Sequence, residues 1–366
     1  MPDPIPMLLM VRELDSGGSE RQMAETALSL DRSRFDPRVG CFRPTGMRGD
    51  ELRSGGVPIV HFPVPSLATI KGAVQIARYI RKQGIRLVHT FDTPANLCAV
   101  PAARMAGSAV VVSSQRVHRG LWPGYVRHGL RVTDHLVDGI VVNCEFLRQH
   151  LREDEKIPPG LIHLCYNGID TSVFQPESRG RTEALRESSL VVGVVCGLRP
   201  EKGLATLLEA FAAVHAIVPG MRLAIVGSGP CLPDLERRAQ ALGILRDCIF
   251  EPATKRVADW LRAIDIFVLP SLSEALSNSL MEAMACGCCV VASRVGGNPE
   301  LVTHGETGML FAPGDAAALA AILQQLARDP ERRGQMASKA ARFVPVRFSR
   351  EAAARRMGEI YTALLG

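Results

Sequence analysis

Short apolar runs alternate with stretches of helical periodicity along almost the whole chain. Runs such as 7–11, 190–196 and 264–269 are hydrophobic apart from Gly193 and Asp265 and are rich in Val, Ile and Leu, which is typical of strands buried on both faces of a parallel sheet. Amphipathic helical patterns fill the intervals between these runs. This alternation predicts an α/β fold with doubly wound parallel sheets.

The predicted elements fall into two sets. Strands are expected at 7–11, 37–42, 57–62, 86–90, 109–113, 139–143 and 161–166, and then at 190–196, 222–226, 248–250, 264–269, 289–292 and 308–311. Helices are expected at 70–83, 94–105, 144–152, 203–217, 232–242, 255–263, 279–286 and 315–328. A further helical pattern runs from 342 to the end of the chain.

A polar stretch rich in Arg, Glu and Ser separates the two sets of strands. The chain has 366 residues, and a single core stops growing near about 250–300 residues, so two domains are expected. We place a first domain at 1–174, a linker at 175–189, a second domain at 190–344 and a closing helix at 345–366. Two tandem Rossmann-like domains would face an interdomain cleft, which is the usual place for a ligand.

Composition narrows the class of protein. No apolar run approaches the roughly 20 residues of a spanning helix, and the start of the chain does not resemble a signal peptide, so a cytoplasmic protein is expected. The ten cysteines lack the spacing of zinc or redox sites, and many lie in apolar segments. They are therefore predicted to be buried thiols.

The net charge of +6 is unevenly distributed. The segment Lys71–Arg131 contains ten Lys or Arg residues and one acid, Asp92, together with Trp122 and Tyr125. Such a segment is typical of ordinary solvated helix faces, of a surface that binds an anionic acceptor, or of a surface that contacts an anionic membrane at the inner face of the plasma membrane. Nothing in the chain resembles a nucleic-acid-binding module.

The densest candidate chemistry lies at Ser271–Gly287, directly after a predicted strand. Ser277, Asn278 and Ser279 are candidate caps of a short helix, whose N-terminus favours an anion such as a phosphate. Glu274 precedes that helix and Glu282 lies about one turn inside it. A carboxylate is poorly placed beside a phosphate, so each glutamate is expected to face neutral hydroxyl groups. A phosphate flanked by hydroxyl-rich groups describes a nucleotide-sugar.

Other glycine-containing turns also follow predicted strands. Gly197 begins a turn that carries Arg199 and Lys202, two cations suited to a diphosphate. Gly227 ends another strand, and Gly296–Glu300 follows a third. The carboxyl ends of parallel strands meet at one edge of a sheet, so these turns are expected to converge on one phosphate-linked ligand.

The first domain contributes a glycine pair at an equivalent place. Gly17 and Gly18 lie between the first strand and a helical pattern, where they allow close approach to the backbone. The surrounding residues match neither the dinucleotide fingerprint nor a phosphate-binding P-loop.

Taken together, these motifs resemble the family 4 retaining glycosyltransferases of the GT-B fold. The resemblance rests on Glu274-x7-Glu282, Pro200-Glu-Lys-Gly203, Gly296-Gly-x-Pro-Glu300, Gly17-Gly18, Asn167-Gly-Ile-Asp170-x3-Phe174 and Gly305-Glu-Thr-Gly308-x-Leu310. It covers nearly the whole chain. It departs from the family at Gly197, where many relatives have Arg.

The resemblance implies residue roles. Arg199 and Lys202 would hold the donor diphosphate, Glu274 the hydroxyls of the transferred sugar, and Glu282 the ribose. Amides near Ser277–Ser279 would contact the phosphate, and Gly17 and Gly18 would let the first domain approach it. His118 resembles the active-site histidine of the acceptor domain, and the last helix would pack back on the first domain.

The expected reaction is transfer of a sugar from a UDP-sugar or GDP-mannose to a hydroxyl of a glycan or lipid-linked acceptor, in exopolysaccharide or glycolipid synthesis. No DxD motif is placed to bind a metal, so no metal or other cofactor is expected, and the cations would neutralise the leaving diphosphate. A nucleotide-sugar epimerase or a glycan phosphorylase with two such domains, and a non-catalytic partner that binds sugar nucleotides, are the alternative hypotheses.

Overall fold

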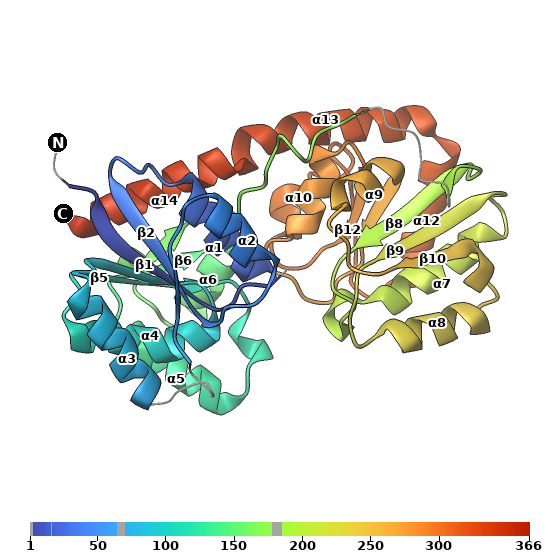
Figure 1. The fold of residues 1–366 in the computed structure, drawn as a ribbon. Coiled ribbons are helices and arrows are strands. Elements are labelled where there is room, and N and C mark those ends of the chain that lie inside the picture. Colours follow the sequence, from blue (N-terminus) through green and yellow to red (C-terminus); the bar gives the residue numbers. More distant parts are fainter. Residues whose placement is uncertain (1–2, 16, 64–69, 178–184) are drawn as a thin grey trace. The chain divides into compact units, whose positions relative to one another are not determined.

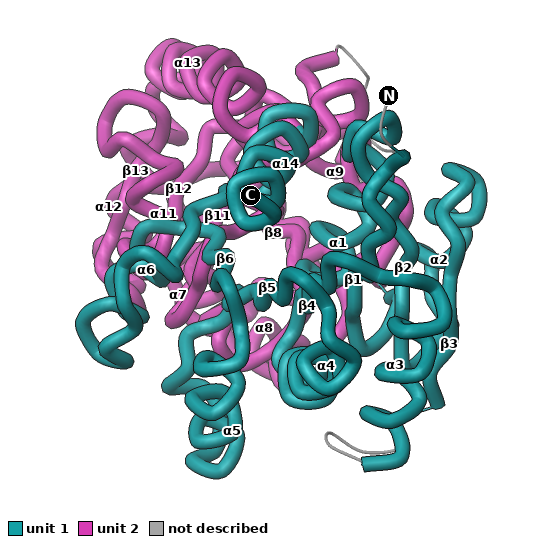
Figure 2. The backbone as a smooth tube through the Cα atoms, turned by 90° about the vertical axis from the view of Figure 1, so that its left-hand side faces the viewer, with its two compact units in different colours: residues 1–168, 350–366 teal, residues 169–349 magenta. Residues whose placement is uncertain are grey.

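The computed structural model describes residues 3–15, 17–63, 70–177 and 185–366. It divides the chain into two compact units, coloured separately in Figure 2. Unit 1 comprises residues 1–168 and 350–366, and unit 2 comprises residues 169–349. The boundary between the units therefore falls six residues before the end of the predicted first domain. The predicted linker, 175–189, lies partly outside the described residues.

Unit 1 is built on a seven-stranded parallel sheet with the order β3-β2-β1-β4-β5-β6-β7. The strands of this sheet are drawn in blue to green in Figure 1. From β1 the chain moves outward to β3, and from β4 it moves outward the other way, so the sheet has its topological switch point between β1 and β4. The strands are β1 (Ile5–Glu13), β2 (Phe35–Arg43), β3 (Ile59–His61), β4 (Leu87–Thr90), β5 (Val110–Gln115), β6 (Gly139–Val142) and β7 (Ile162–Leu164).

Helices pack on this sheet in two groups. The helices α3, α4 and α5 contact one another in sequence, and α1 contacts both α2 and α14. Their bounds are α1 (Gly18–Ser29), α2 (Met47–Ser54), α3 (Ile70–Lys82), α4 (Thr93–Ala106), α5 (Gly124–Asp134), α6 (Glu145–Glu153) and α14 (Arg350–Leu365), with 3-10 turns η1 (Arg119–Leu121) and η2 (Pro159–Leu161).

Unit 2 has a six-stranded parallel sheet with the order β10-β9-β8-β11-β12-β13. Its switch point lies between β8 and β11. The strands are β8 (Leu190–Val195), β9 (Met221–Val226), β10 (Cys248–Glu251), β11 (Ile266–Leu269), β12 (Cys289–Ser293) and β13 (Met309–Phe311). All of β8, β11 and β12 are buried, as expected of parallel strands covered on both faces.

In unit 2, α7 packs against α8 and α12, and α10 packs against α9 and α13. The bounds are α7 (Leu204–His215), α8 (Leu232–Ala241), α9 (Val257–Ala263), α10 (Asn278–Ala285), α11 (Asn298–Leu301), α12 (Ala316–Arg328) and α13 (Pro330–Phe348), with 3-10 turns η4 (Pro200–Lys202) and η5 (Leu245–Asp247).

The end of the chain differs from the sequence-based prediction. Residues 345–348 belong to α13, with Pro345 inside that helix, and α14 begins at Arg350. Between the two helices Ser349 is extended and pairs with Ile169, whose N–H donates to Phe348 O at 2.9 Å. Proline normally marks the edge of a helix, which is why the pattern suggested a start near 345.

The last helix is part of the core of unit 1. Met357, Ile360 and Tyr361 of α14 lie in the same buried cluster as Met7 and Leu9 of β1. The Tyr361 hydroxyl lies 2.6 Å from Nδ1 of the fully buried His89. The helix therefore contributes to the stability of unit 1.

Two features of the sequence-based picture can be checked directly. All ten cysteines are unpaired thiols, and the prediction of buried thiols is confirmed for seven of them, whereas Cys196, Cys231 and Cys248 are half-buried. Among the described residues, no helix has both the length and the apolar character needed to cross a bilayer.

Candidate active site

The loops that follow β8 and β11 meet at the switch point of unit 2. Nζ of Lys202 lies 2.6 Å from Oε2 of Glu274, and the two side chains are only 11% and 13% exposed. Ser271 Oγ donates to the same carboxylate oxygen at 3.1 Å. Of the two cations predicted to hold a diphosphate, Lys202 is thus joined directly to the glutamate predicted to hold the sugar.

Glycines allow these loops to pack backbone against backbone. A Cβ on Gly203, which has φ of +61°, would lie 2.3 Å from Pro270 O, and one on Gly296, with φ of +53°, would lie 1.9 Å from Glu274 O. Only glycine adopts such conformations readily and also leaves room for a neighbouring carbonyl. Three of the predicted turns therefore converge, those after β8, β11 and β12.

The turn after β9 joins the same group. A Cβ on Gly227 would lie 1.9 Å from Cys196 O, and Leu198 N donates to Ser228 O at 3.0 Å. Gly197 differs from these glycines, because the nearest atom to a Cβ there is Arg199 Nε at 3.7 Å. Packing requires glycine at 227 and does not require it at 197.

Arg199 is placed differently from Lys202. Its Nε lies 2.9 Å from Oε1 of Glu201, and its side chain is 59% exposed. The two predicted cations thus have separate carboxylate partners, and Arg199 is the more accessible of the two.

The helix α10 begins where the capping residues predicted it. Ser277 is the N-cap, and its Oγ accepts a hydrogen bond from Leu280 N at 3.3 Å and lies 3.2 Å from Ser279 Oγ. Asn278 is the first residue of the helix, and the first N–H groups of any helix lack partners within it. Glu282 lies one turn further on and is buried.

A buried polar network behind Glu274 was not predicted from the sequence. Ser293 Oγ donates to Ser271 O at 2.6 Å, and Nδ2 of the fully buried Asn298 donates to Ser293 O at 3.0 Å. This chain of hydrogen bonds joins the turn after β12 to the loop that carries Glu274. The signal in the sequence that could have indicated this network was Asn298, a polar residue within the Gly296–Glu300 motif.

Unit 1 has a pocket of about 150 Å³ at its own switch point. It is lined by the ends of β1, β4 and β5 and by the start of α1, where Gly17 is the N-cap and Gly18 the first residue. The lining residues are Arg12, Ser19, Glu20, Phe91, Asp92, Thr93, Pro94, Ser114, Arg116, Val117 and Trp122.

Two carboxyl groups of this pocket have unusual pKa values. Burial raises the pKa of Glu20 to about 7, with smaller contributions from the carboxylates of Asp92 and Glu13, and burial raises the pKa of Asp92 to about 6, with a smaller contribution from Glu13. Asp92 is held in place because Oδ2 accepts from Arg12 N at 2.7 Å and Oδ1 accepts from Ala95 N at 2.8 Å. Neither acid was singled out from the sequence as a site residue.

His118 lies against a second histidine. Its ring stacks on that of His150 with centroids 3.8 Å apart and a 32° tilt, and its Nδ1 accepts from Gly120 N at 3.0 Å. His150 Nδ1 lies 2.6 Å from Asp154 Oδ2. Burial lowers the pKa of His118, with a smaller contribution from His150.

These three residues are the one group of potential metal ligands found within the described residues. Nitrogen lone pairs lie in the plane of each imidazole ring, so two stacked rings do not direct them at one point. As arranged, His118, His150 and Asp154 form a stacked pair with a hydrogen-bonded carboxylate.

The basic segment Lys71–Arg131 is less cationic at the surface than its sequence suggests. Arg119 is buried and makes a bidentate ion pair with Asp134, at 2.7 and 2.9 Å. Glu155, also buried, lies 2.8 Å from Arg131. Acids from later in the chain therefore neutralise part of the segment, and the exposed cations that remain gather mainly on α3, at Lys71, Arg78, Arg81 and Lys82.

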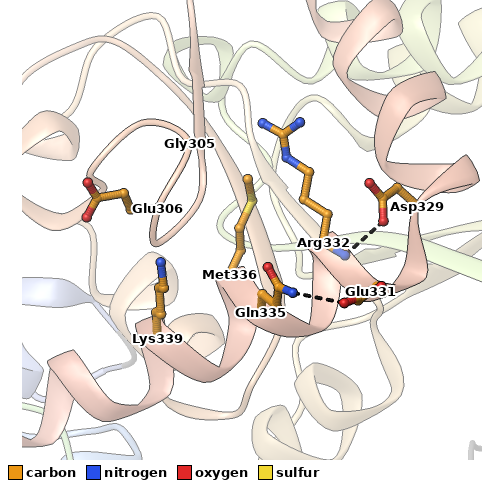
Figure 3. A pocket seen from close by; sticks show the side chains of 8 residues that line it. All are labelled: Gly305, Glu306, Asp329, Glu331, Arg332, Gln335, Met336 and Lys339. Atoms are coloured by element: carbon orange, nitrogen blue, oxygen red, sulfur yellow. Dashed lines mark hydrogen bonds between the residues drawn. The ribbon is translucent and has the colours of Figure 1, made fainter.

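A larger pocket of about 330 Å³ lies elsewhere on unit 2 (Figure 3). It lies between the turn before the edge strand β13 and the first turns of α13, whereas the Lys202 loop follows the central strand β8. Its lining is Gly305, Glu306, Asp329, Glu331, Arg332, Gln335, Met336 and Lys339. The charged side chains of this pocket are largely solvated, and neither Lys202 nor Glu274 lines it. We therefore do not include this pocket in the candidate active site.

Comparisons with known proteins agree with this arrangement. Residues 16–173 match the family model described as Glycosyltransferase Family 4, and residues 189–329 match that of Glycosyl transferases group 1. The chain is 31% identical over 291 residues to a GDP-mannose-dependent alpha-(1-6)-phosphatidylinositol monomannoside mannosyltransferase of Mycolicibacterium smegmatis, covering 75% of this chain and 74% of that protein. It is 30% identical to a D-inositol 3-phosphate glycosyltransferase of Thermobispora bispora, covering 77% of this chain and 66% of that protein.

Solved structures share the fold. The Anabaena protein HepE in complex with UDP-glucose superposes with a TM-score of 0.85 at 21% identity, over 98% of this chain and 100% of that one. Sucrose-phosphate synthase from Thermosynechococcus elongatus gives a TM-score of 0.84 at 21% identity, over 98% and 99% of the two chains. With its two parallel sheets and matched family models, the chain belongs to the family 4 glycosyltransferases, the group 1 glycosyl transferases of the GT-B fold.

Proposed function

We propose that this protein transfers a hexosyl group, with retention of configuration, from a UDP-sugar or GDP-mannose to a hydroxyl of a glycan or lipid-linked acceptor, in exopolysaccharide or glycolipid synthesis. The observation that carries the proposal is the buried contact between Lys202 and Glu274 across the switch point of unit 2. Ligands of open α/β sheets bind at that point. The named relatives support the choice of donors, since one uses GDP-mannose and HepE was crystallised with UDP-glucose.

Lys202 can serve the donor without leaving Glu274. An ammonium group has three N–H donors, so one can remain on Glu274 Oε2 while another contacts a phosphate oxygen. The positive N-terminal end of the α10 helix dipole adds to the positive potential that Lys202 creates at the phosphate. The accessible Arg199 would complete the set of cations. These groups would stabilise the negative charge that develops on the leaving diphosphate.

The two carboxylate oxygens of Glu274 have different roles in this proposal. Lys202 and Ser271 both contact Oε2, so Oε1 is the oxygen proposed to accept hydrogen bonds from hydroxyls of the transferred sugar. Glu282, one turn inside α10, is proposed to contact the ribose. As the family resemblance implies, Gly17 and Gly18 are proposed to let the first domain approach the phosphate. His118 is proposed to be the active-site histidine of the acceptor domain.

The chemical step needs no separate protein nucleophile. The bond between the anomeric carbon and the phosphate oxygen breaks, and its electron pair goes to the diphosphate. The acceptor oxygen forms a new bond to the anomeric carbon on the same face, and its proton passes to the departing phosphate oxygen. The fixed cations lower the energy of this charge separation, for which no metal is invoked.

Incubation with a panel of UDP-sugars and GDP-mannose tests the proposal. We expect release of nucleoside diphosphate from one donor, faster when a sugar or lipid-linked acceptor is present. Isomerised donor without release would favour an epimerase, and binding without turnover would favour a non-catalytic partner. Either result would contradict the proposal.

Contact with an anionic membrane is a second part of the proposal. The proposed contact surface is α3, and no longer the whole Lys71–Arg131 segment. Lys71, Arg78 and Lys82 are exposed and share one helical face by their spacing. We expect the protein to float with vesicles that contain anionic phosphatidylglycerol, and less with neutral phosphatidylcholine. Replacing these three residues with Gln should abolish flotation, whereas replacing the exposed Lys255, Arg328 and Lys339 should not. Equal flotation of both triple variants would contradict this assignment.

A further inference from the structure

One side of α6 carries two rings and a carboxylate that meet the loop after β5. Phe146, His150 and Asp154 are spaced by four residues, so they follow one another along the same side of the helix and its C-cap. The loop that they meet contains His118, the N-cap of η1. The proposed function makes His118 an active-site residue and gives the three residues of α6 no role.

The ring of His118 is held by three contacts. It stacks on the ring of His150, with centroids 3.8 Å apart and a tilt of 32°, and the ring of Phe146 lies 5.7 Å away at 30°. At its edge, Nδ1 accepts a hydrogen bond from Gly120 N at 3.0 Å. Rotation of a histidine ring about its bond to Cβ is otherwise broadly distributed. These contacts together therefore select one orientation of the ring.

The contact with Gly120 also determines which nitrogen of His118 carries the proton. A backbone N–H can only donate, so Nδ1 holds a lone pair and the proton of the neutral ring lies on Nε2. Burial lowers the pKa of His118, with a smaller contribution from His150. The other charged groups near this ring are Asp154, Glu155 and Arg127. At neutral pH the ring is therefore uncharged, and Nε2–H is its hydrogen-bond donor.

His150 is fixed in turn by Asp154. Nδ1 of His150 lies 2.6 Å from Oδ2 of Asp154, and a carboxylate only accepts, so this nitrogen carries a proton. Nε2 of His150 is buried and has no hydrogen-bond partner within the part of the chain that the structure describes. A buried polar atom without a partner costs free energy. An apolar ring at position 150 would avoid that cost, so folding alone does not favour histidine here.

We infer that His150 is a positioning residue for the proposed reaction. With Phe146 and Asp154, it holds the ring of His118 in the one orientation in which Nδ1 meets Gly120 and Nε2–H is free to donate to the substrates. This inference rests on the proposed function, in which His118 is the active-site histidine. It assigns His118 the role of a donor and not of a base, because the lone pair of its neutral ring is occupied by Gly120. His150 acts through His118 and needs no contact with the substrates.

Kinetic variants measure the cost of releasing the ring. We expect His150→Ala to lower kcat about tenfold or more at saturating donor and acceptor, with KM for the donor changed less than about twofold, because a misplaced group costs rate more than ground-state binding. His150→Phe keeps a flat ring for stacking, and Asp154→Ala removes the same hydrogen bond from the other side. These two variants should lower kcat by a similar and smaller factor, about threefold.

A double-mutant cycle with His118→Ala separates positioning from a purely structural role. When His118 is already Ala, His150→Ala should change kcat by less than about twofold, because the two residues act as a unit. Asp154→Ala keeps the test decisive if His150→Ala fails to fold, since the Asp154 side chain is 68% exposed. His215→Ala is the matched control, because it breaks a comparable contact with Asp247 in unit 2, and it should leave kcat unchanged.

The orientation of the ring can be measured without turnover. In protein that contains isotope-labelled histidine, proton–nitrogen NMR spectra distinguish protonated from unprotonated ring nitrogens. The chain has nine histidines, and His118→Gln identifies the signals of His118 by their loss. We expect Nε2 of His118 to be protonated and Nδ1 unprotonated in the wild type, and the two tautomers to exchange in His150→Ala.

Two results would overturn the inference directly. One is an equal loss of kcat from His150→Ala with and without His118, and the other is a protonated Nδ1 of His118 in the wild type. Activity lost to a chelator and restored by Zn²⁺, in the wild type but not in Asp154→Ala, would also overturn it by assigning these side chains to a metal ion. Failure of the proposed function has a different signature, because no donor would release nucleoside diphosphate while the tautomer of His118 still depended on His150.

Discussion

The ammonium group of Lys202 and the carboxylate of Glu274 form a buried ion pair, 2.6 Å apart, across the switch point of the unit 2 sheet. The two residues are separated by 72 positions in the chain, and the pair exists because the turns after β8 and β11 run side by side. In the proposed reaction, this pair would hold a cation for the leaving group beside an acceptor for sugar hydroxyls. We regard this pair as the centre of the donor site.

The turn at Gly296 fixes the position of Glu274. Ala in place of Gly296 would put a Cβ 1.9 Å from the Glu274 carbonyl oxygen, at φ of +53°. We expect Gly296→Ala to lower kcat/KM for transfer by about tenfold or more, which corresponds to a loss of about 1.4 kcal/mol. Steady-state kinetics with the active donor provides the measurement.

Gly334→Ala is the control for that substitution. Gly334 lies inside α13 with nothing near a built Cβ, so Ala there is expected to leave kcat/KM unchanged and to favour the helix slightly. Equal kinetics of the two variants would show that the turn at Gly296 does not position Glu274.

Glu20 should make stability depend on pH. Burial raises the pKa of Glu20 from 4.5 to about 7, so the folded state holds this proton more tightly than the unfolded chain. Its favourable contribution is therefore present below about pH 4.5 and is lost as pH rises towards 7. We expect Glu20→Gln to be more stable than the wild type at pH 8 by roughly 1–3 kcal/mol, and about equal at pH 4.5.

Urea unfolding at the two pH values checks this expectation. Asp50→Asn removes a carboxylate whose side chain is 80% exposed and should show no such difference. A gain in Glu20→Gln of the same size at both pH values would indicate a packing effect in place of proton linkage.

The C-terminal helix should be needed for the stability of unit 1. Tyr361→Phe removes the hydroxyl that lies 2.6 Å from His89 Nδ1 and leaves that buried nitrogen without its partner. The expected loss in free energy of unfolding is about 1–3 kcal/mol, measured by denaturant titration. Tyr125→Phe removes an equivalent hydroxyl from a side chain that is largely exposed and should be neutral. A neutral Tyr361→Phe would mean that the contact between the Tyr361 hydroxyl and His89 does not stabilise unit 1.

Much of the fold could be predicted because buried parallel strands leave a clear signal. Apolar runs rich in Val and Leu located β8 and β11, and the loops after these two strands identified Lys202 and Glu274. The helices α2 and α5 were missed because each buries only a few residues and contains glycine, Gly49 in one and Gly129 in the other.

The pocket of unit 1 could not be predicted in the same way. Glu20 and Asp92 lie far apart in the sequence, and the burial that raises the pKa of each arises only when β1 and β4 pair. The sequence also overstated the positive charge that the Lys71–Arg131 segment carries at the surface. The acids that neutralise Arg119 and Arg131 come from later in the chain.

The central claim is that Lys202 stabilises the leaving diphosphate, and the most direct test is kcat of Lys202→Met at saturating donor and acceptor. Loss of one charged contact to the transition state predicts a fall of about 10²-fold or more. Lys339→Met, in the unrelated pocket at α13, should retain the wild-type kcat. A Lys202→Met enzyme with a kcat within about threefold of the wild type, less than 1 kcal/mol, would contradict the account.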